Sequence, residues 1–515
     1  MLHTRFIAVV TGIYNKWKQP LGIYALLSVV WIYLLALAVF YALVTAYFPT
    51  QNGDNIEHIH SSFLVAQGEI PYRDFFQHHH PLLWFLFAPF AWFFRYDTTV
   101  AEVACFVSLL FFLKSLVYVY RIGAEFLANR WWGLLAAAVI ATPATKLYAI
   151  DLRPDNYMIF CLMAGLYWYF TYLKINQTRS LVIAFGWFFL SFMFAQKALF
   201  ALLVLGLSGL YFWQRKEIKT ADLLKALIFP LVGIGCFIGY LCYYDIFKLY
   251  FLCNYRFNLQ LVEGFEFSKI VKMPLYIQLI TVCGWLGVCG SWWRPNRYWG
   301  MLVVLFVAEF FQRRFYFSPY SYYYWFMVYL AVLTALPVFY HWGQKLKGLN
   351  FLILFMLIYH GITMMTAYYN FAKHESKQPY LPDYITRRLT PCDYVFNGDG
   401  MMYNIFGRDP AYYWQLIGQL DIIGEQVGIR AKPDINMLIR QYRPKFIFGR
   451  NYFNRFAEEN GVKKIVHYVD TELIEQFYEP TPFYPVYQLK AVYDKRLCRQ
   501  NSAGIWQYQN EIDVK

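Results

Sequence analysis

Long apolar segments recur through the first 370 residues of this 515-residue chain, and they constrain its fold more than any other feature. A helix crosses a bilayer core with about 20 consecutive apolar residues. Eleven segments are candidate spans: 22–46, 98–120, 131–146, 156–173, 181–196, 198–212, 226–244, 274–292, 298–312, 322–340 and 349–369. Because 59% of the residues are hydrophobic and only 15% are charged, the composition excludes a soluble globular protein. We therefore predict an all-α polytopic membrane protein.

The orientation follows from the basic residues, because cytoplasmic loops are enriched in Lys and Arg. No small-residue cleavage site follows segment 22–46, so it is predicted to be a retained span and not a signal peptide. With a cytoplasmic N-terminus, the inner segments hold 15 Lys/Arg in 63 residues and the outer segments hold 10 in 98. The sequence thus predicts a multi-pass plasma (inner) membrane protein whose odd span count places the C-terminus on the outer, periplasmic face.

The composition changes after residue 370. Residues 371–515 hold 19 Lys/Arg and 17 Asp/Glu, a balance typical of a water-exposed surface. Short apolar strands at 393–396 and 445–448, with a helix at 435–442, predict a small α/β domain. We therefore divide the chain into a membrane domain, 1–370, and an outer-face domain, 371–515. Most of the net charge of +14 falls in the membrane half, as expected for inner basic loops at an anionic leaflet, which argues against a nucleic-acid partner.

Nine cysteines are present. Seven lie in or beside apolar runs and are predicted to fill space in the core, namely Cys105, Cys161, Cys236, Cys242, Cys253, Cys283 and Cys289. The other two, Cys392 and Cys498, fall in the C-terminal region. They could form a disulfide there if that region faces an oxidising space.

Two acidic residues, Asp54 and Glu57, stand just outside the first apolar segment. If 54–67 is helical, these carboxylates and Ser61 share one face, because residues three or four apart are neighbours on a helix. His60 lies near that face, and Gly68 would end the helix. Asp54 could simply cap the helix N-terminus, but charge at a membrane boundary is usually functional. We therefore expect a catalytic carboxylate here.

The same outer segment continues with further titratable and aromatic side chains. Tyr72 and Asp74 follow the predicted helix, and three consecutive histidines, 78–80, come shortly afterwards. Three adjacent histidines cannot all point the same way on a regular element, so a metal site is the weaker alternative. We expect Tyr72, Asp74, His79 and His80 to line a site for a polar headgroup.

A second outer loop precedes the apolar segment 156–173. Pro154 suits the first turn of a helix, and Asp155 lies beside it at the positive end of the helix dipole. Asp151 and Arg153 come directly before. One interpretation is a capped helix start with an Arg neighbour. The other is a second carboxylate facing the first, with Asp155 catalytic and Asp151 and Arg153 binding substrate.

Basic residues interrupt later apolar segments. Lys197 divides the apolar run 181–212 into two legs, and a lysine in such a place must meet an anion or water. Arginine suits phosphate through bidentate contacts. We predict substrate-binding roles for these cations and a neighbouring tyrosine, namely Lys197, Arg256, Arg313, Arg314 and Tyr320. The alternative is that the lysine snorkels and that the arginines anchor helix ends.

The order of these features resembles the GT-C membrane glycosyltransferases. An acidic pair follows the first span, then Gly68-x-x-Pro71-Tyr72-x-Asp74, a histidine stretch and a proline. An Arg-x-Asp at 153–155, a lone lysine in an apolar hairpin and an Arg-x-Tyr-x-x-Pro at 314–319 complete the series. The pattern is most similar to bacterial protein O-mannosyltransferase-like and lipopolysaccharide-core glycosyltransferase-like enzymes, with the aminoarabinose lipid A transferases further off.

The resemblance implies a reaction. A polyprenyl-phosphate sugar is the donor, and a hydroxyl of an envelope glycan, lipid or protein at the outer face is the acceptor. Asp54 takes the position of the catalytic carboxylate, with Glu57 as the alternative because the two acids are three residues apart. Asp155 or Asp151 takes the second acidic position, and Lys197 with Arg314 would hold the lipid phosphate. No cofactor is required, although related oligosaccharyl transferases use a divalent ion.

Two other functions are compatible with intramembrane charge. The first is a non-enzymatic transporter of lipid-linked sugars, although the hydropathy shows no inverted repeat. The second is a polymerase or ligase that uses diphosphate-linked oligosaccharides. Such enzymes usually depend on a late outer loop with paired arginines, whereas the loop richest in titratable residues here is the first.

Overall fold

The structure is a computed structural model that describes most of the chain between residues 53 and 508. The described residues are 30, 33–34, 36–37, 40, 53–142, 150–260, 275–292, 296–315, 324–345, 358–359, 361–363, 365–366, 381–397, 404–414, 419–448, 455–459, 462–466, 469–483, 486–494, 498–500 and 506–508. Most of the residues of predicted segments 22–46 and 349–369 lie outside them. Each of the nine predicted segments between these two overlaps a helix.

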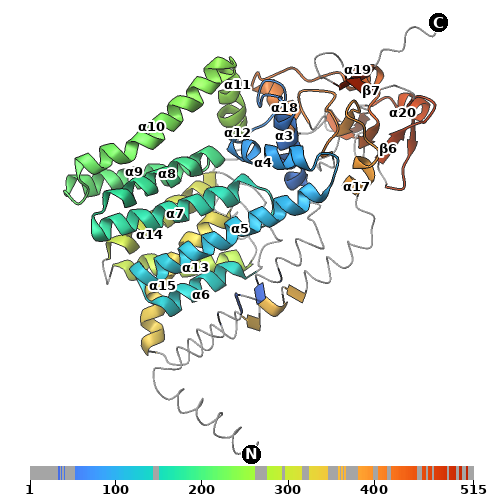
Figure 1. The fold of residues 1–515 in the computed structure, drawn as a ribbon. Helices are drawn as coiled ribbons and strands as arrows, with labels where there is room; N and C mark the ends of the chain where they lie inside the picture. The colour runs from blue at the N-terminus through green and yellow to red at the C-terminus, as the bar shows by residue number, and fades with distance from the viewer. Residues whose placement is uncertain are drawn as a thin grey trace, which may run out of the picture.

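These helices form a stacked bundle (Figure 1). They are α5 (Thr99–Ile122) continued by the π-turn η1 (Gly123–Leu127), α6 (Arg130–Ala141), α7 (Pro154–Ile175), α8 (Thr178–Phe194), α9 (Ala198–Gln214), α10 (Thr220–Tyr243), α13 (Leu275–Ser291), α14 (Arg297–Phe315) and α15 (Trp325–Lys345). Within the described residues, four helical segments are long and apolar enough to cross a membrane: Thr99–Leu127, α7, α10 and α15. Helices α11 (Phe247–Phe251) and α12 (Phe257–Gln260) flank a second π-turn, η2 (Leu252–Arg256).

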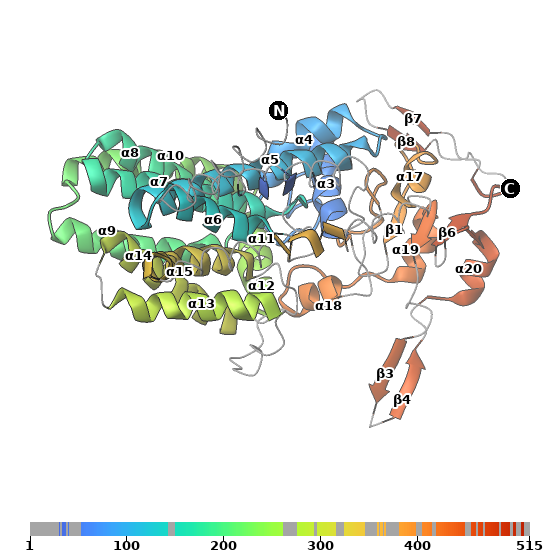
Figure 2. The ribbon, with the colours of Figure 1, turned by 90° about the horizontal axis from the view of Figure 1, so that it is seen from below.

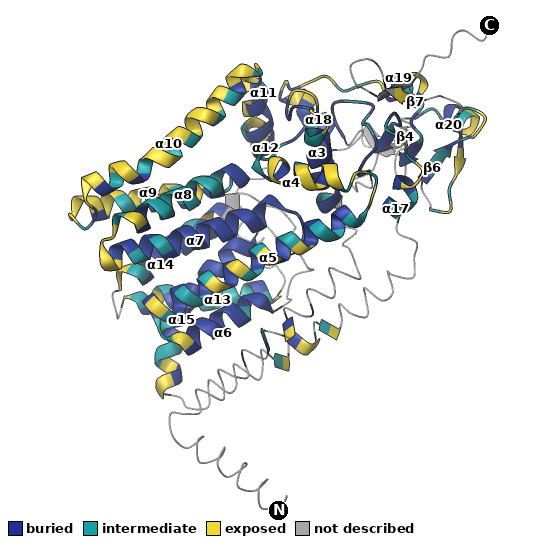
Figure 3. Ribbon diagram, viewed as in Figure 1, coloured by how far each residue is buried: buried dark blue, intermediate teal, exposed yellow. Residues whose placement is uncertain are grey.

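Burial separates the central helices from the peripheral ones. Helix α7 is buried along most of its length, whereas α10 is exposed on most sides (Figure 3). An apolar helix that is exposed in the protein alone is suited to contact lipid. Some of the seven cysteines that are predicted to fill the core lie on exposed faces of such helices, so this prediction is only partly right. Cys105, Cys161 and Cys253 are buried, Cys283 is half-buried, and the exposed ones are Cys236, Cys242 and Cys289.

Local sequence explains where these helices begin and end. Pro154 starts α7, and Asn176 ends it in the left-handed conformation with φ of 53°, which asparagine tolerates better than most residues. The predicted two-leg arrangement is confirmed, because the chain turns at 195–197 between α8 and α9. Close helix contacts need glycine: a Cβ on Gly287 of α13 would collide with the carbonyl oxygen of Thr334 on α15.

Residues 53–97 contain one helix that the sequence predicts and a second that it does not. Helix α3 (Gly53–Ala66) matches the predicted helix, and Gly68 ends it with φ of 90°. A second helix, α4 (Leu82–Phe93), is absent from the prediction. The reason is that its apolar run is too short to span a bilayer. One face of α4 buries Trp84 and Phe87, while Trp92 and Phe93 are exposed.

The C-terminal part is a mixed α/β structure beside α3 and α4 (Figure 2). Its main sheet has the order β1-β2-β6-β5, with β1 (Val395–Asn397) parallel to β2 (Phe446–Phe448) and the other pairs antiparallel. Strands β6 (Val486–Leu489) and β5 (Tyr478–Pro480) complete it. Two hairpins, β3 (Arg455–Glu459) with β4 (Val462–Val466) and β7 (Cys498–Gln500) with β8 (Trp506–Tyr508), and four helices, α17 (Leu381–Thr386), α18 (Gln419–Gln426), α19 (Ile435–Tyr442) and α20 (Thr471–Phe477), accompany this sheet.

A disulfide joins Cys392 to Cys498, which are 106 residues apart in the chain. It connects the residues before β1 to strand β7. The two cysteines that the sequence singles out for pairing are therefore bonded to each other.

Candidate active site

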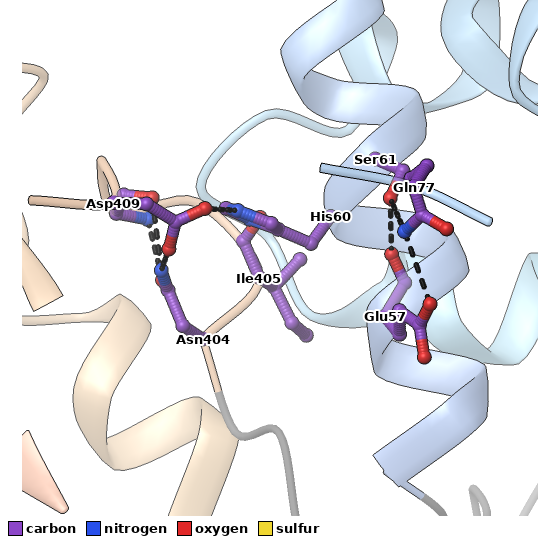
Figure 4. Close-up of polar contacts among 8 residues, drawn as sticks. Glu57, His60, Ser61, Gln77, Asn404, Ile405 and Asp409 are labelled. Atoms are coloured by element: carbon purple, nitrogen blue, oxygen red, sulfur yellow. Dashed lines mark hydrogen bonds and ion pairs between the residues drawn. The ribbon is translucent and has the colours of Figure 1, made fainter. Parts of the chain in front are cut away.

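The polar face of helix α3 carries the first part of the site. Gln77 donates from Nε2 to Oε1 of Glu57 at 3.0 Å and to Oγ of Ser61 at 2.7 Å, as Figure 4 shows. The predicted sharing of one helix face by Glu57 and Ser61 is thus observed. Burial, and next the charge of Asp54, raise the pKa of Glu57 to about 8. Glu57 is therefore a neutral carboxylic acid at pH 7.

The carboxylate of Asp54 has a different environment. It forms an ion pair with Arg153 at 2.5 Å, and its side chain is 42% exposed, whereas Arg153 is only 5% exposed. The same guanidinium contacts Asp151 at 3.2 Å. The side-chain oxygen of Asn55 accepts from the backbone of Leu152 at 2.9 Å. The second predicted loop is thereby fixed to the start of α3, and the carboxylate of Asp54 remains partly exposed.

Lys197 completes the charged group. Its Nζ lies 3.0 and 3.3 Å from the two carboxylate oxygens of Asp155, in the first turn of α7. Both side chains are largely buried, at 8% and 12% exposed. Lys197 sits at the turn between α8 and α9, and the neighbouring Gln196 donates to the carbonyl of His78 at 2.9 Å. The lysine is therefore close to the segment that follows α3.

A group of neutral histidines borders these charges. The rings of His78 and His79 lie 4.2 Å apart, and that of His58 lies 5.4 Å from His79. Burial, and next the charge of Lys197, lower the pKa of His78 to about 4. Burial likewise holds the pKa values of His58 and His79 well below their usual range. Trp84 donates from Nε1 to Nδ1 of His58 at 3.2 Å, which assigns the proton of that neutral imidazole to Nε2.

Two predicted binding residues have their ring nitrogens in contacts within the protein. His80 contacts the carbonyl of Phe192 through Nδ1 at 2.6 Å and the hydroxyl of Tyr250 through Nε2 at 3.0 Å. His60 contacts the carbonyl of Ile405 through Nδ1 at 2.9 Å and Asp409 through Nε2 at 2.8 Å. Figure 4 shows that it points away from Glu57, toward the C-terminal domain.

His60 is an imidazolium in this arrangement. Both ring nitrogens face oxygen acceptors, so both must carry a proton. Burial lowers the pKa of His60, but Asp409 and the carbonyl of Ile405 outweigh that effect, and the net result is a raised pKa. The residue joins α3 to the C-terminal domain.

The structure places the other predicted residues at varying positions. Tyr72 is buried and donates to the carbonyl of His79 at 2.6 Å. Asp74 pairs with Arg73 at 2.8 Å at the surface, and Arg256 is exposed on η2. Arg313 and Arg314 fall in the last turn of α14, and their side chains lie outside the description, as does all of Tyr320.

The sequence interpretation missed three residues of the site, His58, Gln77 and Trp84. His58 follows Asp54 by four residues, so helical spacing alone could have placed it on the same face. No pattern identifies Gln77, because its bonds to Glu57 and Ser61 bring together residues that are 20 and 16 positions apart. Among the described residues, no group of three or more His, Cys, Asp and Glu has an arrangement that could hold a metal.

No family model and no curated protein sequence matches this chain. Solved structures do. ArnT from Cupriavidus metallidurans bound to undecaprenyl phosphate superimposes with a TM-score of 0.56 at 11% identity over 82% of this chain and 92% of ArnT. The apo state of that protein gives 0.56 at 12% identity over 83% and 94%. The apo oligosaccharyltransferase of Archaeoglobus fulgidus gives 0.45 at 13% identity over 93% and 74%. The chain thus has the fold of ArnT, and it is at the level of this fold that the resemblance predicted from its motifs is confirmed.

Proposed function

We propose that this protein is a membrane glycosyltransferase that moves a sugar from a polyprenyl-phosphate donor to a hydroxyl acceptor at the outer membrane face. The supporting observation is the convergence of three segments on one charged site. Asp54 from α3, Arg153 and Asp155 from the start of α7, and Lys197 from the turn between α8 and α9 form two linked ion pairs. A partly exposed carboxylate beside fixed cations is what sugar transfer from a phosphate ester requires.

In the proposed mechanism, Asp54 accepts the proton of the acceptor hydroxyl while the acceptor oxygen attacks the anomeric carbon. The bond from that carbon to the phosphate oxygen breaks in the same displacement, so the anomeric centre is inverted. Arg153 orients Asp54, and Glu57 stays protonated beside it. The described cluster holds three carboxylates, Asp54, Asp151 and Asp155, against two cations. Arg313 and Arg314, which the sequence predicts to bind substrate, would supply further positive charge to the departing phosphate.

We also propose that the chain divides into a membrane domain and an outer-face domain at residue 370. Residues 1–370 carry the site and cross the plasma membrane, with the N-terminus in the cytoplasm. Residues 371–515 form an outer-face domain, and the disulfide between Cys392 and Cys498 supports its placement in an oxidising space. The relative ArnT is described with bound undecaprenyl phosphate, which supports a polyprenyl-phosphate donor here.

The test uses purified full-length protein in liposomes with radiolabelled polyprenyl-phosphate sugars and a membrane extract as the acceptor source. We expect wild-type protein to transfer label and Asp54→Asn to transfer none above background. Asp245→Asn is the matched control, because Asp245 is exposed at the end of α10 with φ of 53°, a conformation that asparagine tolerates. Movement of labelled lipid across the bilayer without transfer would instead make the protein a transporter.

A further inference from the structure

A hollow lies where the segment after α3 meets the C-terminal domain. Its volume is about 550 Å³, within the range of roughly 300–1,000 Å³ that small-molecule sites occupy. One wall comes from the segment after α3 and includes Glu69, Arg73 and Phe75. The other comes from the C-terminal domain and includes Tyr394, Arg408 and Tyr442.

Direct bonds hold the two walls together. Besides the ion pair of His60 with Asp409, the hydroxyl of Tyr412 donates to the carbonyl of Tyr72 at 2.7 Å. Arg430 donates to the carbonyl of Arg73 at 2.5 Å and lies over the ring of Tyr412 at 4.0 Å. The hollow is thus a built feature of the folded chain.

Glu69 lines this wall with a carboxyl group that can still accept hydrogen bonds. Its side chain is half-buried, and within the described part of the chain its carboxyl group has no hydrogen bond or ion pair. Partial burial, and next the charge of Asp409, raise its pKa to about 7. The oxygens of this carboxyl group are not among the buried side-chain atoms of the described chain that lack a partner, so a ligand in the hollow that donates hydrogen bonds can reach them.

The facing wall is aromatic and basic. The rings of Tyr394 and Tyr442 lie 4.7 Å apart at 45°, and Arg408 lines the same space. The charges of Asp74 and Asp409 are already balanced by Arg73 and His60. Aromatic faces suit the C–H surface of a sugar ring, while a carboxyl group opposite a guanidinium suits its hydroxyls.

We propose that this hollow is a glycan subsite, which binds a sugar of the acceptor that is remote from the reacting hydroxyl. This inference rests on the proposed function. Leu64, in the last turn of α3, lines the hollow, and from Asp54 to Leu64 the helix rises by about 15 Å. This distance exceeds the size of one sugar ring, so the acceptor is an extended saccharide that reaches from the hollow back to Asp54.

The binding test applies purified full-length protein to an array of immobilised neutral and acidic oligosaccharides. Wild-type protein is expected to bind a set of neutral glycans, and Glu69→Gln and Tyr394→Ala to weaken that binding about tenfold. The control Arg440→Ala, which alters an exposed residue of α19, should bind as wild type does. Glu69→Gln should melt at or above the wild-type temperature at pH 7, because the native carboxyl group makes no bond within the described residues and its raised pKa disfavours the folded, charged form.

Two results would overturn the glycan subsite. One is the absence of binding to every glycan on the array. The other is equal binding by wild type and by both hollow variants. A transfer assay separates this failure from failure of the proposed function. If wild-type protein transfers sugar and Glu69→Gln leaves the acceptor KM unchanged, the subsite is wrong and the function stands. If glycan binding depends on Glu69 but no transfer occurs with any polyprenyl-phosphate sugar, the function is wrong.

Discussion

Replacing Glu57 by Gln tests whether Asp54 or Glu57 is the catalytic base, a choice that the sequence leaves open. The side chain is 6% exposed and accepts a hydrogen bond from Gln77 at 3.0 Å, and burial raises its pKa to about 8. At pH 7 it is therefore already neutral, and glutamine preserves its size and its acceptor oxygen. We expect Glu57→Gln to change the transfer rate by no more than about twofold. Asp54→Asn should lower the rate by about 10² to 10⁴-fold, the usual contribution of a general base.

The free energy of unfolding should depend on pH differently in wild type and in Glu57→Gln. The folded chain holds the proton of Glu57 up to a pKa of about 8, whereas the unfolded chain releases it near 4.5. Between these values folding binds a proton, so the free energy of unfolding falls as pH rises, by about 1.4 kcal/mol per pH unit. Above pH 8 this contribution stops changing. Glu57→Gln lacks the effect, so its stability advantage is small at pH 5 and largest at pH 8.

The assay is urea unfolding of the detergent-purified proteins at pH 5, 6, 7 and 8. Glu475→Gln serves as the control, because Glu475 is exposed in α20, and its curve should run parallel to the wild-type curve. A constant difference between wild type and Glu57→Gln across this range would refute the neutral state of Glu57. A loss of transfer in Glu57→Gln as large as that in Asp54→Asn would make Glu57 the base.

Three further changes test other contacts. Lys197→Ala should raise the donor KM about tenfold, measured in the liposome assay, and an unchanged KM would contradict a phosphate role. Reduction of the Cys392–Cys498 disulfide should lower the stability of the C-terminal domain by about 2–4 kcal/mol, seen as a lower melting temperature that the Cys392→Ser variant reproduces. Asp409→Asn removes the partner of His60, whose raised pKa gives stability that is complete below pH 6.5 and lost as pH rises through the folded pKa. The melting temperatures of Asp409→Asn and wild type should therefore differ more at pH 6 than at pH 9, and an equal difference at both would argue against the charged pair.

Apolar length and helix-boundary residues predict most of the helical bundle. The turn at Lys197 and the start of α7 at Pro154 are predictable because each has a local cause. Helix α4 is not predictable in this way. Its 12 residues are fewer than a membrane span needs, and hydropathy alone does not distinguish a short apolar helix from a loop.

The sequence predicts which charged residues belong to the site, but it does not predict which of them form ion pairs with each other. Sequence order brought Asp54, Arg153 and Lys197 to the same outer face, but only the tertiary structure shows that Lys197 contacts Asp155. The prediction that His60 lies near the helix face of Asp54 is wrong, because it did not take the rotation per residue of an α-helix into account. At about 100° per residue, six residues place it about 120° around the helix from Asp54, so it meets the C-terminal domain. The glycan subsite joins residues more than 300 positions apart, which no local pattern reveals.

The link between Cys392 and Cys498 also bears on how the polypeptide is made. The second sulfur belongs to a residue that is synthesised 106 positions after the first. At a translation speed of roughly 5–20 residues per second, the earlier thiol waits about 5 to 20 seconds for its partner. Under the proposed placement of the C-terminal domain on the outer face, Cys392 is open to oxidation with other thiols during that interval, so a cell that produces this protein in quantity would benefit from a disulfide isomerase on that face.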